Sequence, residues 1–255
     1  MKTGFSRRQT TSQESYWQRL FNSYACHSED HLISGWSREG WQQRMAAYFT
    51  ELKAVGLPEG SLVLDLGCGS GSYCRILAER GYRTVGMDYA RKVVFEAKKR
   101  SSEEKGRYLC GTIHHLPFQD NVFDHVLCIG VFQSLMQYLE ALVEIKRVLA
   151  VDAPLLIMTL NRWEITTVVK RILGSEERIF INSKPVPRLN TYDPRVFRRE
   201  LEKVGFYDIK LMPLQIFPGS LVKFSGFIRN CWDRMPFLPY LTAHTFVVRA
   251  YKGES

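Results

Sequence analysis

The chain has 255 residues, of which 45% are hydrophobic, and a formal net charge of +9 at pH 7. This length and composition predict one domain with a full hydrophobic core and room for insertions. No stretch approaches the roughly 20 consecutive apolar residues that cross a bilayer, so no membrane-spanning helix is expected. The six cysteines lack the paired spacing of a zinc site. We therefore expect reduced thiols, a cytoplasmic protein and no bound metal.

Basic residues gather in two parts of the chain, over 91–107 and over 170–199. Such a surface favours polyanions: nucleic acid, an anionic membrane surface or a phosphorylated substrate. Because glutamates are interspersed among the cations, an ordinary solvent-exposed helix face explains them equally well. Residues 1–15 are basic and polar without an apolar segment, which predicts a short disordered arm and no signal peptide.

Regular structure is expected to begin with an amphipathic helix over 39–56, where apolar side chains recur at spacings of three and four. Gly56 and Pro58 end this helix. Beyond it, short apolar strands alternate with helices of about ten residues, which predicts a parallel sheet with helices on both faces. The expected strands are 61–67, 82–88, 106–113, 123–130 and 153–161, and the expected helices between them are 72–81, 90–100 and 138–150.

The alternation changes after Asn161. Residues 162–191 are predicted to be a partly helical insertion, and 193–206 a helix with Pro194 at its first position. Two strands, 207–217 and 243–252, close the chain, and apolar residues at helical spacing between them predict an apolar cap segment over 216–240. We divide the chain into an N-terminal arm and lid segment (1–38), a core (39–161), the insertion (162–191) and a C-terminal part of the same domain (192–255).

Three glycines, Gly67, Gly69 and Gly71, stand where the first strand passes into the first helix of the core. A turn there directs backbone N–H groups toward a ligand, and glycine lets that ligand approach closely. The spacing departs from the dinucleotide fingerprint, which has a glycine where this chain has Ser72. Asp88 ends the second strand, where it either binds ribose hydroxyls or caps the next helix. We favour a nucleoside-bearing cofactor.

Four motifs together resemble the class I S-adenosylmethionine-dependent methyltransferases, particularly the small-molecule group that includes the ubiquinone and menaquinone enzymes. They are LDLGCGSG (64–71), VGMD (85–88), LPFQDNVFDHVL (116–127) and EIKRVL (144–149). The resemblance implies an α/β fold: a Rossmann-like, doubly wound sheet of seven strands. The sheet would be mostly parallel with an antiparallel last strand, and helices would cover both faces.

The resemblance also implies S-adenosyl-L-methionine as cofactor, S-adenosylhomocysteine as product, and the residues that hold them. Asp88 would bind the ribose between Met87 and Tyr89, and Thr112 and Ile113 would border the adenine. Because many relatives carry an Asp where Thr112 stands, adenine binding here would depend more on packing against Ile113. The methionine end would be held by Asp65, Gly67, Cys68, Gly69 and Gly71. For Asp65, a purely turn-forming role is the alternative.

Methyl transfer from a sulfonium chiefly needs an aligned nucleophile and the exclusion of water. A general base is required only for an acceptor that holds its proton firmly, such as an alcohol. Relatives often carry a His after the fourth strand, where this chain has Gln133 and Ser134. His114 and His115 are therefore the candidate bases, with a non-catalytic loop position as the alternative for each. Four N-terminal aromatic residues either close over the site or simply pack: Tyr16, Trp17, Tyr24 and Trp36.

The acceptor is inferred from motifs that the sequence lacks. No D/N-P-P-Y/F motif follows the fourth strand, and Cys128 lies within an apolar strand, so methylation of a nucleic-acid base is disfavoured. The cap segment over 216–240 either roofs an apolar acceptor, contacts an anionic membrane or packs on the domain. We predict a cytoplasmic methyltransferase for a small or lipid-linked acceptor, at oxygen, with peripheral membrane contact as an option.

Two alternatives stay open. The protein could instead methylate nucleic acid or protein through its basic surface, or it could bind the cofactor without catalysing a reaction.

Overall fold

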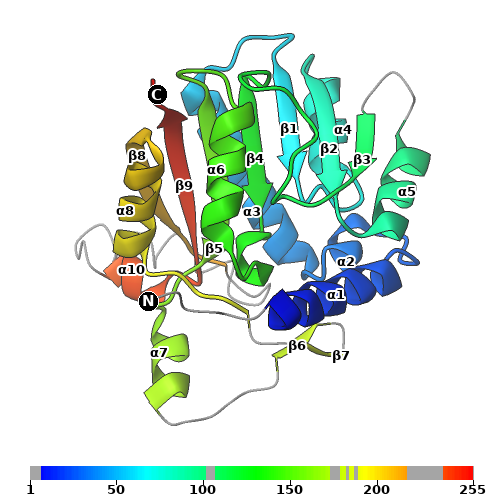
Figure 1. The fold of residues 1–255 in the computed structure, drawn as a ribbon. Coiled ribbons are helices and arrows are strands. Elements are labelled where there is room, and N and C mark those ends of the chain that lie inside the picture. Colours follow the sequence, from blue (N-terminus) through cyan, green and yellow to red (C-terminus); the bar gives the residue numbers. More distant parts are fainter. Residues whose placement is uncertain are drawn as a thin grey trace.

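A computed structural model shows one seven-stranded sheet covered on both faces by helices (Figure 1). The structure describes residues 7–101, 107–172, 179–181, 184–186, 189–216 and 238–254. The predicted cap helix and most of the cap segment, at 217–237, lie outside these residues. In the described part of the chain, no helix is long and apolar enough to cross a membrane.

The sheet has the strand order β3-β2-β1-β4-β5-β9-β8. The first five strands in the chain run parallel, and β9 runs antiparallel to both β5 and β8. The predicted topology is thereby confirmed, including the antiparallel last strand. The strands are β1 (Leu62–Leu66), β2 (Arg83–Asp88), β3 (Arg107–Cys110), β4 (His125–Ile129), β5 (Pro154–Leu160), β8 (Phe206–Leu214) and β9 (Thr245–Lys252).

Helices cover the sheet in two layers because neighbouring strand residues point to opposite faces. Leu64 packs in one core with α6 and α8, and Val63 packs in a second core with α3 and α4. Figure 1 shows α6 and α8 in front of the sheet and α3 behind it. The bounds are α3 (Arg38–Val55), α4 (Ser72–Glu79), α5 (Arg91–Arg100), the 3-10 helix η1 (Phe132–Ser134), α6 (Tyr138–Val148), α8 (Pro194–Val204) and α10 (Leu238–Thr242).

The N-terminal segment forms α1 (Arg7–Tyr24) and α2 (Asp30–Ile33). The prediction of a disordered arm over 1–15 is therefore wrong from Arg7 onward. Trp17, Leu20 and Tyr24 recur at spacings of three and four and are buried in one cluster, so burial of this apolar face stabilises a helix whose first turns are polar.

The insertion holds α7 (Ile165–Ile172) and a small antiparallel pair, β6 (Ile179–Ile181) and β7 (Lys184–Val186). Its predicted helical part is present, whereas the strand pair was not predicted. Where the chain re-enters the core, the Asp193 side chain accepts a hydrogen bond from the Arg195 N–H and Pro194 occupies the first position of α8, as its sequence predicts.

A histidine is buried in the middle of the sheet. In β4, His125 is fully buried, with Nδ1 2.8 Å from the Pro154 carbonyl oxygen and Nε2 3.2 Å from the Tyr48 hydroxyl. A carbonyl can only accept, so Nδ1 carries a hydrogen. Burial lowers the pKa of His125 to about 4, so the ring is neutral at pH 7 and Nε2 accepts from the Tyr48 hydroxyl.

We expect acid to destabilise the fold through this ring. An unfolded His takes up a proton below its ordinary pKa of 6.5, whereas folded His125 stays neutral down to a pKa of about 4. The stabilisation is thus complete above pH 6.5 and declines from there to pH 4. Between pH 7 and pH 5, the free energy of unfolding of the wild type should fall by about 2 kcal/mol more than that of His125→Gln. Urea unfolding at the two pH values measures this difference, and equal losses would contradict it.

Candidate active site

Two adjoining clefts lie between the carboxyl edge of the sheet and α1, which crosses below this edge in Figure 1. The first compartment has a volume of about 340 Å³ and the second about 90 Å³. Their linings share Gly67, Asp88, Tyr89, Val131 and Ser134. One elongated ligand could therefore occupy both compartments and pass over the shared residues.

The first compartment is built mainly from the ends of β1, β2 and β3. Seven of the residues nominated from the sequence line it: Gly67, Met87, Asp88, Tyr89, Thr112, Ile113 and His114. Across the cleft, α1 contributes Ser15 and Gln18, and Gln18 Nε2 donates to the Tyr89 carbonyl oxygen at 2.9 Å. α1 is thus bonded to the residue that follows Asp88.

The second compartment is apolar and aromatic. Its polar lining residues include Gln133 and Ser134, from η1. They also include Asp88, which the first compartment shares. The remaining lining is mostly large and apolar: Trp17, Phe21, Ile33, Trp36, Val93, Ile129, Val131 and Leu189.

The glycine turn lies at the junction of the compartments. Gly67, Gly69 and Gly71 all have positive φ, at 74°, 54° and 79°, a region that non-glycine residues avoid. A Cβ on Gly67 would stand 2.1 Å from a Val131 methyl, and one on Gly71 2.6 Å from the Tyr108 hydroxyl. A Cβ on Gly69 would meet only Ser34 Oγ, at 3.8 Å. Gly67 and Gly71 are therefore required by packing, whereas Gly69 borders open space in the second compartment.

Asp88 connects this turn to the end of β2. Its Oδ2 accepts from the Gly69 N–H at 3.1 Å and its Oδ1 accepts from the Ala90 N–H at 2.8 Å. Burial raises the pKa of Asp88, against the backbone hydrogen bonds that lower it. The residue preceding α5 is Ala90, so Asp88 is not the N-cap residue of that helix. Its carboxylate keeps acceptor capacity for a ligand, since two oxygens offer about four acceptor positions.

Four nominated residues line neither compartment: Asp65, Cys68, Gly71 and His115. Asp65 is buried beneath the turn, where it accepts from Cys74 Sγ at 3.5 Å. Burial raises the pKa of Asp65 to about 7, against the hydrogen bond from Cys74. The Cys68 thiol is buried as well, and His115 is exposed outside the clefts. A direct contact of these side chains with a ligand in the clefts is not supported.

Of the two candidate bases, only His114 reaches a compartment. Its side chain is mostly buried, and Nδ1 lies 3.9 Å from Glu140 Oε2, on α6. This carboxylate can hold the ring in one orientation. His114 borders the first compartment and not the second, so it lies on the Asp88–Ile113 side of the shared residues.

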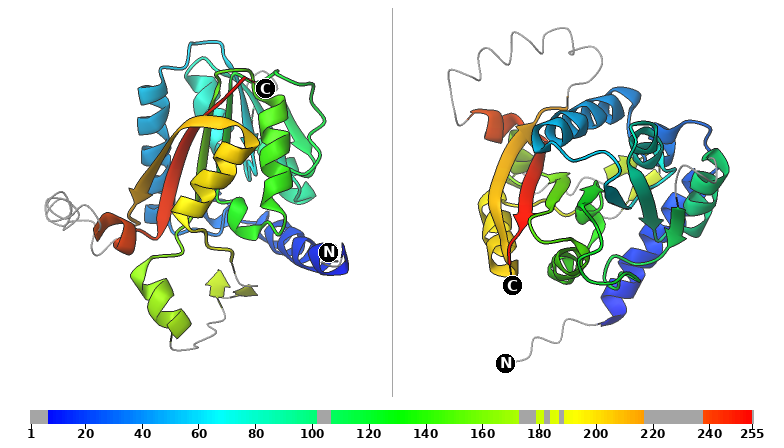
Figure 2. Two further views of the ribbon diagram at one scale, coloured as in Figure 1. Left: turned by 60° about the vertical axis from the view of Figure 1, so that its left-hand side comes forward. Right: turned by 90° about the horizontal axis from the view of Figure 1, so that it is seen from above.

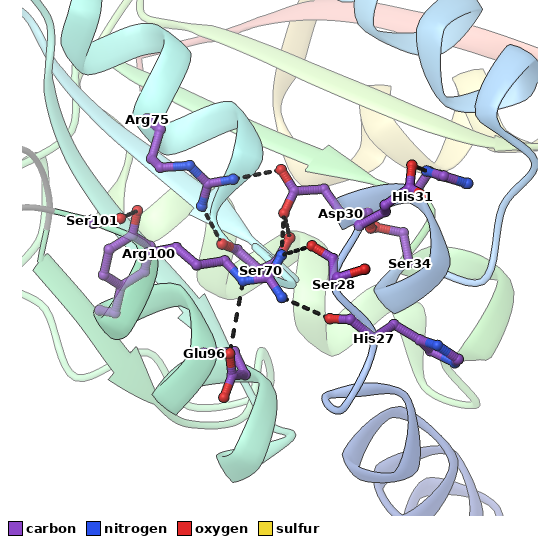
Figure 3. A network of polar contacts seen from close by, with 12 residues as sticks. His27, Ser28, Asp30, His31, Ser34, Ser70, Arg75, Glu96, Arg100 and Ser101 are labelled. Carbon is purple, nitrogen blue, oxygen red and sulfur yellow. Dashed lines mark hydrogen bonds and ion pairs between the residues drawn. The ribbon is translucent and has the colours of Figure 1, made fainter.

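A network centred on Asp30 ties the lid to the glycine turn (Figure 3). Asp30, the first residue of α2, accepts from Ser70 Oγ at 2.7 Å, from Arg75 at 2.5 Å and from Arg100 at 2.9 Å. Arg75 in turn donates to the Ser70 carbonyl oxygen at 2.5 Å. Because Ser70 follows Gly69, one carboxylate connects the lid to the floor of the second compartment.

The described residues contain no group of three His, Cys, Asp or Glu side chains able to hold a metal ion. All five described cysteines are free thiols.

Part of the chain matches a known protein family. Residues 64–157 match the family described as "Methyltransferase domain". Probable tRNA methyltransferase 9B of Mus musculus is 34% identical over 128 residues, which are 45% of this chain and 27% of that protein. Demethylmenaquinone methyltransferase of Staphylococcus aureus is 30% identical over 124 residues, which are 47% of this chain and 49% of that protein.

Among solved structures, magnesium protoporphyrin IX methyltransferase from Synechocystis, with bound S-adenosylhomocysteine, has a TM-score of 0.61 and 18% identity. The match covers 96% of each chain, so the likeness extends to the whole fold. Residues 64–157 thus carry a methyltransferase domain, and the resemblance drawn from the motifs is confirmed over this part of the chain. The chain spans about half or less of the length of the curated relatives compared here.

Several lining residues were not nominated from the sequence, chiefly Phe21, Ile33, Val131 and Leu189. The sequence pattern could have indicated Phe21, because it lies four residues after Trp17 on the same helix face. No pattern in the sequence indicated Leu189: it lies near the end of the insertion (162–191), and only the fold brings it to the clefts. Of the four aromatic lid candidates, Trp17 and Trp36 line the second compartment, whereas Tyr16 and Tyr24 do not.

We expect Asp30→Asn to loosen the lid. The change removes the charge that Arg75 and Arg100 share, and should lower the free energy of unfolding by about 2 kcal/mol. Amide hydrogen exchange across 7–33 should accelerate relative to the sheet. The matched control is Glu29→Gln: its carboxylate pairs with Arg38, both largely exposed, and should change exchange little. Equal acceleration in the two variants would argue against a specific tie through Asp30.

Proposed function

We propose that the protein transfers a methyl group from S-adenosyl-L-methionine to an acceptor that enters the second compartment. The observation that carries this proposal is the open space at Gly69. A Cβ on this positive-φ glycine would meet only Ser34 Oγ, at 3.8 Å, and the residue lines the second compartment beside the Asp88 carboxylate, which borders both clefts. In a turn that served packing alone, a side chain would fill that space, as Val131 does beside Gly67 and Tyr108 does beside Gly71.

The residues present fit the cofactor. Ile113 offers an apolar surface and Thr112 a hydroxyl in the first compartment, suited to a purine. Asp88 can accept from ribose hydroxyls while it keeps its bonds to the turn. The space at Gly69 leaves room for the methionyl part along the turn. Asp65, in contrast, would act from beneath by supporting the turn.

The cofactor, when bound, supplies an electrophilic sulfonium methyl group. The chain's own residues then have two tasks, to exclude water and to orient the acceptor. Trp17, Phe21 and Trp36 cover the second compartment with apolar surface. Gln133 and Ser134 provide the polar groups that can align an acceptor atom.

We propose a small or lipid-linked acceptor with a flat or apolar reacting part, methylated at oxygen. The aromatic lining and the similarity to a demethylmenaquinone methyltransferase support the apolar character of the acceptor; the choice of oxygen is a proposal that the turnover assays test. A tRNA acceptor is the second candidate, favoured by the similarity to a probable tRNA methyltransferase and by Arg91 and Lys92, exposed at the start of α5. Turnover assays with quinol and phenol acceptors against transcribed tRNA separate the two.

Gly69→Ala should weaken binding of S-adenosylhomocysteine at least tenfold, because its Cβ enters the space assigned to the cofactor. Gly56→Ala is a matched control, since Gly56 has a φ of 67° and no neighbour within 4 Å. Both variants strain the backbone alike, by about 1 kcal/mol, but only the first borders a cleft. Calorimetry measures the affinities. Equal affinities would refute the assignment of Gly69, and no heat with wild type would refute the cofactor.

We propose that the acceptor's hydroxyl extends from the second compartment past Ser134, which lines both compartments, toward His114 in the first. His114→Ala should then lower kcat about 100-fold with a hydroxyl acceptor, the usual effect of losing a general base, while affinity for S-adenosylhomocysteine falls far less. His115→Ala should leave both unchanged because its side chain lies outside the clefts. Steady-state kinetics and calorimetry on the two variants test this. Full activity of His114→Ala would remove His114 as a base and indicate an acceptor that ionises by itself.

A further inference from the structure

The outward face of α7 is apolar. Ile165, Val169 and Ile172 are 54%, 46% and 78% exposed, and their spacing of four and three puts them on one side of the helix. Trp163, just before the helix, is 45% exposed. Figures 1 and 2 show α7 projecting from the body of the domain below the sheet. We call these four residues the α7 stripe.

A surface helix normally turns its apolar side toward the core, so an exposed apolar stripe marks a contact surface. The structure also joins the base of α7 to α10. Asn161 Nδ2 donates to the carbonyl oxygens of Tyr240, at 2.6 Å, and Ala243, at 2.8 Å. Tyr240 and Leu241 are themselves large exposed residues. α10 therefore carries an exposed apolar pair as well, and hydrogen bonds hold its backbone to Asn161, shortly before α7.

The α7 stripe is connected to the edge of the sheet at which the clefts open. It follows the carboxyl end of β5, at the same edge of the sheet as the clefts. The Arg162 N–H donates to the Tyr192 carbonyl oxygen at 2.9 Å, and Leu189, three residues before Tyr192, lines the second compartment. A surface held by α7 would thus lie close to the entrance for the acceptor.

The charged residues near the α7 stripe indicate which kind of partner this surface can bind. The segment 162–172 contains three cations, Arg162, Lys170 and Arg171, and one acid, Glu164. Glu164 is buried and accepts from the Thr167 N–H at 2.9 Å, so it is withdrawn from the surface. The stripe is therefore set in a basic segment of a chain with net charge +9.

A second exposed apolar pair, on α6, shows the contrast. Leu139 and Val143 are 42% and 55% exposed, but Glu140, 60% exposed at its side chain, stands between them. An anionic surface would repel Glu140 and so disfavour contact with this pair, whereas it would attract the cations of the segment that carries the α7 stripe.

We propose that the α7 stripe docks the protein on an anionic lipid bilayer. Exposed apolar residues on one helix face, a Trp at its start and nearby cations are the features of a helix that lies in the membrane interface. A protein partner would not require the basic surroundings. The docking itself stands on the stripe and its charge; that a lipid-linked acceptor then enters from the bilayer rests on the proposed function.

Flotation with vesicles tests the docking. The full-length wild type should bind vesicles that contain 30% phosphatidylglycerol in phosphatidylcholine, and bind pure phosphatidylcholine far less. Val169→Gln/Ile172→Gln should lower the partition coefficient at least tenfold, because two apolar side chains no longer enter the interface. Val143→Gln/Val196→Gln, which changes two equally exposed valines on α6 and α8, should bind as the wild type does. Circular dichroism verifies that each variant is folded.

Brominated lipid supplies a second readout. Bromine in the upper acyl chain should quench part of the Trp fluorescence of the wild type, and Trp163→Phe should remove most of that quenching.

No binding of the wild type to anionic vesicles, or equal binding of the two double variants, would overturn the proposal. So would a wild type that only self-associates through α7, seen by light scattering as an oligomer that the Val169→Gln/Ile172→Gln variant loses. Calorimetry with S-adenosylhomocysteine on the same preparations keeps the two proposals apart. If the wild type does not bind vesicles but still gives binding heat with S-adenosylhomocysteine, the docking proposal is refuted and the proposed function is not.

Discussion

The site depends on how one turn is anchored to the strand beside it. The Met87 carbonyl oxygen accepts from the N–H groups of both Gly67, at 2.7 Å, and Cys68, at 3.2 Å. The Asp88 carboxylate then accepts from Gly69. Three consecutive residues of the turn are thus bonded to the end of β2. This pairing requires positive φ at Gly67 and Gly69 and leaves the glycine-lined junction open to both compartments.

The lid depends on the same turn. Asp30 reaches Ser70, one residue beyond Gly69, and brings α2 with its apolar residues over the second compartment. Two arginines neutralise Asp30 and reach it from α4 and α5, which are separate elements of the core. A charge with partners on three elements costs more to displace than an exposed pair, because its removal leaves two guanidinium groups without a carboxylate. The clefts are therefore bounded by the core and the lid together.

The apolar character of the acceptor side and the α7 stripe are consistent with each other. The second compartment has an aromatic lining, and the exposed helix next to it has an apolar face in basic surroundings. The proposed lipid-linked acceptor has apolar parts that the second compartment can surround. It would reside in a membrane, which the α7 stripe can contact. The apolar cap predicted over 216–240 falls almost entirely outside the described residues.

The sequence by itself determined the sheet, its parallel order and the place of the glycine turn, because these follow from local alternation and short motifs. It also identified Asp88, Met87, Tyr89, Thr112, Ile113 and His114 as neighbours, since each lies at or just beyond the carboxyl end of β2 or β3 and such ends share one edge of a parallel sheet. Only the tertiary structure decided which residues face the clefts. Asp65 belongs to the same motif as Gly67, yet the alternation of a strand turns it beneath the turn and buries it. Leu189 and Asp30 join the site through contacts between segments far apart in the chain, and such contacts leave no local pattern in a single sequence.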